Sequence, residues 1–227
     1  MSRTNVMLPL YDITPFTLLD FPDTPAAIVW FAGCNLRCLY CYNPDIVLGA
    51  GRISAEKALS VLAKRIGFLE GVVLSGGECT LYNNLIPFCR SLKIMGYKIK
   101  IDTNGMRPDV IRQLLEKNLL DYVALDYKAP DSKMREICGG GSEKQFWESF
   151  DTLKHSNIEF EVRTTFHPDL LSEEEIIMMS NTLKAMGYQK PFYVQLFRDD
   201  VKTLGMVDSP KRLIDVELLS RFVTLRD

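Results

Sequence analysis

Three cysteines lie close together near the start of the chain, in the segment GCNLRCLYCYN. Cys34, Cys38 and Cys41 follow the spacing CxxxCxxC, directly after the apolar run 26–31. Thiolates this close in a loop can converge on one soft metal centre. A closed structural zinc site takes four nitrogen or sulfur ligands, and both histidines of the chain are remote. On an iron–sulfur cubane, three thiolates instead leave one iron open to a small molecule.

Two other interpretations of these cysteines stay open at this point. A zinc ion could take its fourth ligand from a distant cysteine such as Cys79 or Cys138. Buried free thiols would need apolar surroundings and would not need a regular spacing. Of the six cysteines in the chain, Cys89 falls inside an amphipathic stretch, and Cys138 precedes a glycine run; both are interpreted as structural.

Polar motifs follow each of the next three apolar runs: SGGE, DTNG and DYK. The residues of interest in them are Ser75, Gly76, Gly77, Glu78, Asp102, Thr103, Asn104, Asp126 and Lys128. Glycines let the backbone approach a ligand closely, and a carboxylate accepts hydrogen bonds from an ammonium group. The alternative is turn chemistry, because Asn-Gly is a common turn and Asp-x-Lys can be a surface pair.

Three further polar residues lie near the last predicted strands. Arg163 comes at the end of the run 159–164, where a guanidinium can pair with a carboxylate or simply be solvated. His167 precedes a proline and is interpreted as turn structure. Gln195 lies in the last predicted strand.

Short apolar runs alternate with amphipathic stretches along the chain, which predicts strands that alternate with helices. The predicted strands are 26–31, 71–74, 98–102, 122–125, 159–164 and 192–196, and the predicted helices are 54–66, 82–95, 108–118, 143–155, one that begins at Ser172, and 213–224. Six such units predict an α/β fold with parallel strands, either a partial (β/α)6 barrel or an open doubly wound sheet. In a barrel, the polar motifs would meet at the carboxyl ends of the strands, where barrel enzymes assemble their sites.

No linker or composition change divides the 227 residues, so one domain is expected over residues 1–227. Within it, 1–25 is an N-terminal extension, 26–200 the partial barrel and 201–227 a C-terminal tail with a helix. The formal net charge of -2 gives no overall reason to expect nucleic acid or an anionic membrane as partner. No apolar run is long enough for a transmembrane helix and no signal peptide is evident, so a cytoplasmic location with reduced cysteines is expected.

The cysteine spacing, an aromatic residue (Tyr40) before the third cysteine, and GGE after the next strand together resemble the radical S-adenosylmethionine (SAM) superfamily. The resemblance implies a radical SAM core domain with a partial TIM-type barrel. It implies that the three cysteines hold a [4Fe-4S] cluster whose open iron is chelated by the amino and carboxylate groups of SAM. It also places Tyr40, SGGE and DTNG around SAM, with GGE at the SAM amino group.

The segment DITPFTLLDFPDTPAAIVWFAGCNLRCLYCYNPD and the later VRTTFHPDLLSEEE resemble the glycyl radical enzyme activases, above all those of anaerobic (class III) ribonucleotide reductase. This resemblance implies that Asp102 and Asp126 lie beside a monovalent cation next to the SAM carboxylate. It gives Lys128 and Asp126 catalytic positions, with Lys128 beside the substrate backbone or the SAM methionine. It pairs Arg163 with the SAM carboxylate and brings Gln195 to the adenosine.

Two residues depart from the activase pattern. Tyr42 stands where many activases have histidine after the third cysteine, and Cys79 stands where proline usually follows GGE. A single extra thiol near the site is interpreted as a packing or turn residue rather than a ligand. No second cysteine set of the ferredoxin type is present in the sequence, so one cluster is expected.

The predicted activity is reductive cleavage of SAM to a 5′-deoxyadenosyl radical, which abstracts hydrogen from a glycine of a partner such as anaerobic ribonucleotide reductase. The resemblance implies flavodoxin or ferredoxin as electron donor. One alternative is a radical SAM enzyme that modifies a small molecule or a peptide, as deazapurine-forming synthases do. A second is a non-catalytic metal-binding or electron-transfer module, which would not need GGE, DTNG and DYK at successive strand ends.

Overall fold

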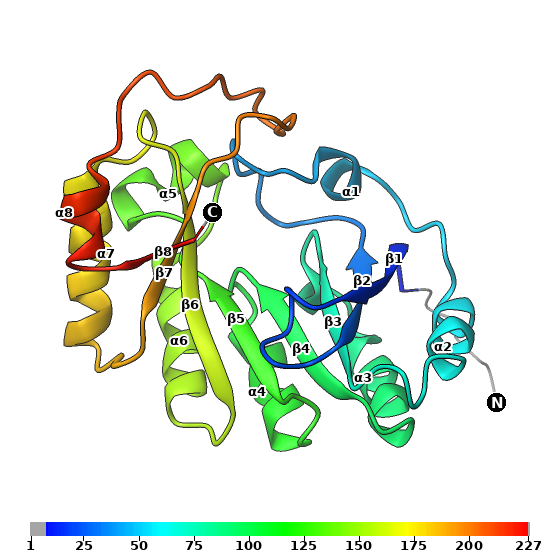
Figure 1. Ribbon diagram of the computed structural model, residues 1–227. Helices are drawn as coiled ribbons and strands as arrows, with labels where there is room; N and C mark the ends of the chain where they lie inside the picture. Colours follow the sequence, from blue (N-terminus) through cyan, green and yellow to red (C-terminus); the bar gives the residue numbers. More distant parts are fainter. Residues whose placement is uncertain (1–7, 227) are drawn as a thin grey trace.

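The computed structural model describes residues 8–226, which form one eight-stranded sheet with helices on its outer side (Figure 1). The strands are β1 (Leu10–Thr17), β2 (Ala26–Phe31), β3 (Gly71–Gly76), β4 (Lys98–Thr103), β5 (Tyr122–Asp126), β6 (Glu159–Phe166), β7 (Phe192–Leu196) and β8 (Thr224–Arg226). Strand β1 is antiparallel to β2, and every later neighbouring pair is parallel.

The strand order decides between the two predicted architectures. Each strand lies beside the next one in the sequence, from β1 to β8. A doubly wound sheet would reverse its strand order at a switch point, whereas a barrel keeps it sequential. The partial barrel is therefore confirmed. In the described residues, β1 and β8 pair with β2 and β7 but not with each other, so the barrel stays open between its two edges.

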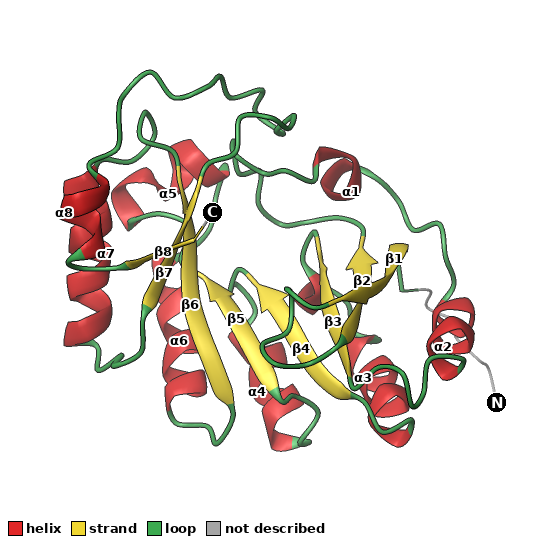
Figure 2. Ribbon diagram, in the orientation of Figure 1, coloured by secondary structure: helices red, strands yellow, loops and turns green. Residues whose placement is uncertain are grey.

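The helices follow the strands in the alternation expected for this fold (Figure 2). They are α1 (Pro44–Leu48), α2 (Ala55–Ala63), a 3₁₀ turn η1 (Cys79–Leu81), α3 (Leu85–Ile94), α4 (Pro108–Glu116), α5 (Asp131–Cys138), α6 (Glu143–Lys154), α7 (Glu173–Ala185) and α8 (Val216–Ser220). Within residues 8–226, none of them combines the length and the apolar character that crossing a bilayer requires.

The predicted strands 26–31 through 192–196 correspond to β2–β7, and the edges of the sheet are where the structure adds to the prediction. Strand β1 forms within the segment expected to be an extension. The C-terminal segment, expected to end in a helix over 213–224, holds the short helix α8 and then strand β8. Helices α1 and α5 are also absent from the prediction.

Local sequence signals explain where several helices begin and end. The Ser54 hydroxyl accepts a hydrogen bond from a backbone N–H of the first turn of α2. Ser172 and Glu175 form a complete capping box at the start of α7, as the SEEE segment predicts. Helix α5 ends at Gly139, whose φ of 67° lies in the left-handed region that glycine adopts most easily.

The ends of β2 and β3 approach each other more closely than any side chain would allow. The Gly77 N–H donates to the Phe31 carbonyl at 2.8 Å, and the Glu78 N–H donates to the Gly33 carbonyl at 2.9 Å. A Cβ atom on Gly77 would lie 1.8 Å from the Gly33 carbonyl oxygen. The glycines of GGE are thus required by the backbone that leads into the cysteine loop, whatever else they bind.

We predict that Gly77→Ala destabilises the protein by about 3 kcal/mol or more, because the new methyl group meets backbone rather than a side chain that could move. Gly67→Ala is the matched control. Its φ is 86° with no atom within 4 Å of the new Cβ, so it should cost only the about 1–2 kcal/mol of a left-handed alanine. Urea unfolding of both variants measures the difference, and equal losses would show that the close approach of β2 and β3 is unimportant.

Candidate active site

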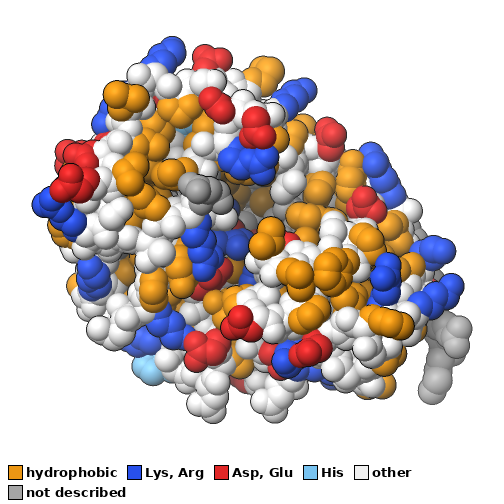
Figure 3. Space-filling model, in the orientation of Figure 1, with side chains coloured by type: hydrophobic (Ala, Val, Ile, Leu, Met, Phe, Trp, Pro, Cys, Tyr) orange, Lys and Arg blue, Asp and Glu red, His pale blue; other side chains and the backbone are white. Residues whose placement is uncertain are grey.

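A cavity of about 430 Å³ lies at the carboxyl ends of the strands, and every residue predicted for the site contributes to its wall. These residues are Cys34, Cys38, Tyr40, Cys41, Ser75, Gly76, Gly77, Glu78, Asp102, Thr103, Asn104, Asp126, Lys128, Arg163 and Gln195. Its size falls in the range of pockets that enclose small ligands, roughly 300–1,000 Å³. Figure 3, which views the barrel from the side, shows a hollow in the middle of the molecule with Lys and Arg side chains beside it. The structure thus brings the predicted residues together, while the individual role of each stays a prediction.

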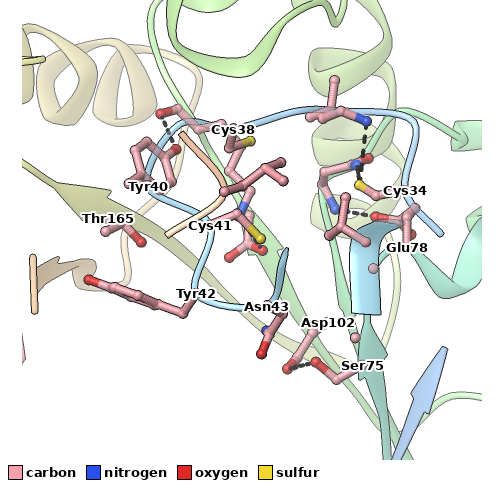
Figure 4. A pocket seen from close by; sticks show the side chains of 18 of the residues that line it. Cys34, Cys38, Tyr40, Cys41, Tyr42, Asn43, Ser75, Glu78, Asp102 and Thr165 are labelled. Carbon is pink, nitrogen blue, oxygen red and sulfur yellow. Dashed lines mark hydrogen bonds and ion pairs between the residues drawn. The ribbon is translucent and has the colours of Figure 1, made fainter. Parts of the chain in front are cut away.

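The three cysteines lie on the loop that leaves β2, above Ser75 and Asp102 (Figure 4). Among residues 8–226, no three Cys, His, Asp or Glu side chains come close enough to share a single metal ion. A [4Fe-4S] cluster does not require that, since each thiolate binds a different iron at a different corner. One loop that presents three free thiols to one cavity fits such a cluster better than it fits a mononuclear zinc site.

Backbone hydrogen bonds hold one side of the cysteine loop against the end of α5. The Arg37 N–H donates to the Cys138 carbonyl at 2.7 Å, and the Leu39 N–H donates to the Ile137 carbonyl at 2.8 Å. The Arg37 guanidinium in turn donates to the Cys34 carbonyl at 2.7 Å. The unpredicted helix α5 is therefore what fixes the middle of the loop.

The loop after β7 holds the other side. The Leu204 N–H donates to the Cys41 carbonyl, and the Gly205 N–H donates to the Leu39 carbonyl, both at 2.9 Å. A Cβ on Gly205 would lie 2.8 Å from the Cα of Leu39, so the two segments touch along their backbones. The cysteine loop is clamped by segments about a hundred residues or more away in the sequence.

The surroundings of the thiols favour their protonated form when no metal is bound. Burial raises the pKa of Cys34 to about 12, and burial also raises the pKa of Cys41. The Cys38 thiol is hydrogen-bonded to Cys138, and this bond, together with burial, raises the pKa of Cys38. The same bond lowers the pKa of Cys138. Binding of a cluster would have to displace protons from these ligands.

Cys138 lies next to the site, although the sequence offered it only as one possible distant zinc ligand and otherwise as a structural residue. It is fully buried in α5, and its thiol lies beside Cys38 and Tyr40. Tyr40 also donates to the Lys128 carbonyl at 2.9 Å, which ties the cysteine loop to the end of β5. Cys138 thus lies directly behind a predicted cluster ligand.

Glu78 is buried and joins the segments that follow β3 and β4. Its Oε1 accepts from the Thr80 N–H at 3.1 Å and from the Thr103 hydroxyl at 2.8 Å. Its Oε2 accepts from the Asn104 N–H at 2.8 Å. Burial raises the pKa of Glu78, although these hydrogen bonds oppose the shift. The carboxylate borders the cavity, but its bonds within the chain show that it also organises DTNG.

Charged side chains from three adjacent strands meet in the cavity wall. Arg163 on β6 reaches Asp126 on β5 (Nε–Oδ1 2.7 Å) and Asp102 on β4 (3.3 Å). Asp126 also accepts from Lys128 at 2.9 Å, and Asp102 from Lys100 at 2.7 Å. Burial alone would raise the pKa of both aspartates, but the adjacent cations outweigh it and lower both. Both carboxylates are therefore ionised at neutral pH.

A second ion pair continues this network toward the edge of the barrel. Glu161 on β6 is buried and pairs with Arg226 on β8 at 3.0 Å. The Glu161 carboxylate also lies 3.9 Å from Arg163. Lys100, Glu161 and Arg226 were not among the predicted site residues. A signal for Lys100 was available, since it lies two positions before Asp102 and so shares its face of β4.

Of the other residues discussed from the sequence, one lines the cavity and three are buried in the surrounding structure. Tyr42 lines the cavity, and its hydroxyl accepts from the Arg198 N–H at 2.7 Å. Cys79 is buried and donates weakly to the Asp102 carbonyl at 3.8 Å, which agrees with a packing role. His167 accepts from the Asp169 N–H and is buried, as expected for turn structure. Cys89 is buried in α3, away from the cavity wall.

Comparison with known proteins adds an independent line of observation. Residues 28–182 match the family model described as the radical SAM superfamily. That range begins in β2, includes all three cysteines, and extends into α7.

Several relatives carry names from one group of enzymes. A protein of Methanocaldococcus jannaschii named as a glycyl-radical enzyme activating enzyme is 34% identical over 179 residues, with 76% of this chain and 74% of that protein covered. The pyruvate formate-lyase-activating enzyme of Clostridium pasteurianum is 29% identical, with 79% and 77% covered. The pyruvate formate-lyase 1-activating enzyme of Escherichia coli strain K12 is 30% identical, with 65% and 63% covered.

Solved structures share the fold at low identity. SuiB of Streptococcus suis, bound to its precursor peptide SuiA, superposes with a TM-score of 0.67 at 17% identity, covering 86% of this chain and 44% of that one. The anSMEcpe structure with bound AdoMet gives a TM-score of 0.58 at 17% identity, covering 73% and 49%. This chain thus spans about half the length of these two solved chains.

We predict that Glu78→Gln lowers the free energy of unfolding by about 1–3 kcal/mol. Backbone N–H groups bond to both carboxylate oxygens, from Thr80 on one and Asn104 on the other, so either orientation of the amide turns an NH₂ group toward a donor. Glu70→Gln is the control, because Glu70 is exposed in its ion pair with Lys98 and should cost less than about 0.5 kcal/mol. Chemical denaturation tests both, and an unaffected Glu78→Gln would contradict this role.

Proposed function

The chain belongs to the radical SAM superfamily as a relative of the glycyl-radical enzyme activating enzymes, and from that premise we propose that it installs a glycyl radical on anaerobic ribonucleotide reductase. The observation that carries this proposal is the convergence on one cavity of the three-cysteine loop, the GGE turn and the charged ends of β4–β6. A metal-binding or electron-transfer module would need only the first of these.

Members of the superfamily bind a [4Fe-4S] cluster through three cysteines, together with SAM. When both are bound, they supply a 5′-deoxyadenosyl radical, which is reactive enough to take hydrogen from an unactivated C–H bond. In this chain Cys34, Cys38 and Cys41 would hold the cluster, because they are the thiols that face the cavity from one loop. The protein's own contribution is to bind, orient and exclude water.

The charged wall of the cavity suits a ligand with a carboxylate. Three cations, Lys100, Arg163 and Lys128, face the two aspartates Asp102 and Asp126, so this group carries one excess positive charge. Arg163 and Lys128 both border the cavity and can donate to a ligand's carboxylate. We assign them to the methionine end of SAM.

The opposite end of SAM would extend toward the later strands. Gln195 on β7 lines the cavity beside Thr165 on β6, its partner in the strand register. An amide side chain offers both a donor and an acceptor, which suits an adenine edge or ribose hydroxyls. Tyr40 closes the wall between the cysteine loop and Lys128.

The open side of the barrel supports a protein substrate. Among the described residues, β1 and β8 are not bonded to each other, and the cavity opens on the face shown in Figure 3. Such a lateral entrance gives an extended loop that carries a glycine a way into the cavity. The electron donor in this proposal is a flavodoxin or a ferredoxin.

We expect Cys38→Ala to abolish cluster binding and SAM cleavage, because a cubane held by two thiolates from this loop loses one of its three anchors. Cys89→Ala is the control, since Cys89 lies in the core of α3 away from the cavity. Iron and sulfide content and 5′-deoxyadenosine formation with dithionite are measured on the anaerobically reconstituted proteins. Wild-type protein that binds iron and sulfide but yields no 5′-deoxyadenosine would overturn the enzymatic proposal.

A second experiment identifies the partner. Reduced enzyme and SAM are mixed anaerobically with anaerobic ribonucleotide reductase, and in parallel with pyruvate formate-lyase, and the glycyl radical is detected by electron paramagnetic resonance. We expect a glycyl doublet with the reductase, which is lost when its radical-site glycine is replaced by alanine. A doublet with pyruvate formate-lyase alone would replace the partner. Active SAM cleavage without a doublet from either would favour a small-molecule or peptide substrate.

A further inference from the structure

Lys100 carries a buried ammonium group that the proposed function leaves without a role. It lies in the middle of β4, and its side chain is only 3% exposed. Its Nζ donates to Asp102 Oδ1 at 2.7 Å. Asp102 borders the cavity, whereas Lys100 does not. A buried lysine is costly unless it is paired, so this position must be explained by the carboxylate that it contacts.

Every carboxylate oxygen of the two aspartates in the cavity wall already has a partner within the chain. The second oxygen of Asp102 accepts from the Ser75 hydroxyl at 2.9 Å and lies 3.3 Å from the Arg163 guanidinium. The two oxygens of Asp126 accept from Arg163 at 2.7 Å and from Lys128 at 2.9 Å. All four oxygens therefore have partners within the chain, and each aspartate has a protein cation on both sides.

A monovalent cation at these aspartates, which the resemblance to the activases implies, does not fit this arrangement. It would find no unpaired carboxylate oxygen and would lie among three positively charged side chains, at Lys100, Arg163 and Lys128. Repulsion between like charges at hydrogen-bond distances inside a protein is severe. The site already holds the positive charge that such an ion would supply.

The three cations differ in whether they can reach a ligand in the cavity. Arg163 and Lys128 both border the cavity, so they can donate their remaining N–H groups to a bound carboxylate while they stay beside the aspartates. Lys100 lies behind Asp102 on the same strand and cannot reach the cavity. It is therefore a counterion that Asp102 does not share with a ligand in the cavity.

We propose that Lys100 is a built-in counterion of Asp102 which takes the place of a bound monovalent cation, so that this chain binds SAM without sodium or potassium. Lys100 is a positioning residue in this proposal, since it acts on the ligand only through Asp102. The proposal rests on the proposed function only for its ligand, SAM. The charge arrangement itself is independent of which molecule receives the radical.

The test compares the reconstituted holoenzyme in the chlorides of potassium, sodium and tetramethylammonium at equal ionic strength. The variants are Lys100→Met, which keeps the length of the side chain without its charge, and Lys98→Met, which removes an exposed lysine of the same strand. Thermal midpoint and the dissociation constant for SAM are both measured. Tetramethylammonium is the reference because it is too large to enter a site built for a metal ion.

The wild type and Lys98→Met should bind SAM equally in the three salts, within about twofold, with unchanged midpoints. Lys100→Met should bind SAM about tenfold more weakly in tetramethylammonium, and potassium or sodium should restore both affinity and midpoint, because Asp102 then needs an external cation. The double variant Lys100→Met/Asp102→Asn lacks both charges of this ion pair, so no buried carboxylate at position 102 needs a cation. Its midpoint should be the same in all three salts.

Two results would overturn the proposal: a wild type whose SAM affinity depends on potassium or sodium, or a folded Lys100→Met that behaves identically in all three salts. If Lys100→Met does not fold, the double variant decides. Its recovery of folding supports a charge role for Lys100, and its failure to fold assigns Lys100 to packing and overturns the proposal. Failure of the glycyl radical experiment leaves the midpoints and their salt dependence unchanged, so the two proposals fail separately.

Discussion

Charge buried inside a barrel has to be paired, and this requirement shapes the site. Barrel interiors are normally filled by layers of apolar side chains, but here β4, β5 and β6 point Asp102, Asp126 and Arg163 into the same space. One guanidinium reaches carboxylates on two other strands. Removing it would break one buried ion pair on each aspartate and leave each with a single lysine as partner. The alignment of these three strand ends is therefore fixed by the same groups that face the cavity.

The cysteine loop is positioned in a different way, through its backbone. Its N–H and C=O groups bond to the end of α5 on one side and to the loop after β7 on the other. Because the backbone carries the contacts, the thiols of Cys34, Cys38 and Cys41 are left to face the cavity. As a consequence, the geometry of the eight-residue cysteine motif depends on the end of α5 and on the loop after β7, which lie about a hundred residues or more away in the sequence. The motif reaches its final geometry only when both segments are folded.

The sequence was sufficient for what local pattern controls. Six parallel strands and the gathering of the motifs at their ends follow from periodicity and from the rule that parallel strands end at one face. Periodicity left a barrel and a doubly wound sheet both possible, and the strand order decides between them. Helix α5 was missed although Pro130 and Gly139 mark its two ends, because its short polar stretch has a weak apolar pattern. Lys100 was missed because a lysine in an alternating strand usually faces solvent. Cys138 was named only as a possible distant zinc ligand, because only the folded chain brings it to Cys38.

Arg163 takes part both in aligning the strand ends and in the proposed binding of the ligand. Its guanidinium neutralises two aspartates and is also the group best suited to a ligand's carboxylate. Arg163 can pair with a ligand's carboxylate as well only if each aspartate has another cation beside it. Lys100 keeps Asp102 paired from behind, and Lys128 does the same for Asp126 from the cavity side. Because each aspartate has a second cation beside it, Arg163 can pair with a ligand's carboxylate at little cost, which accounts for charged residues at strand positions that most barrels fill with apolar ones.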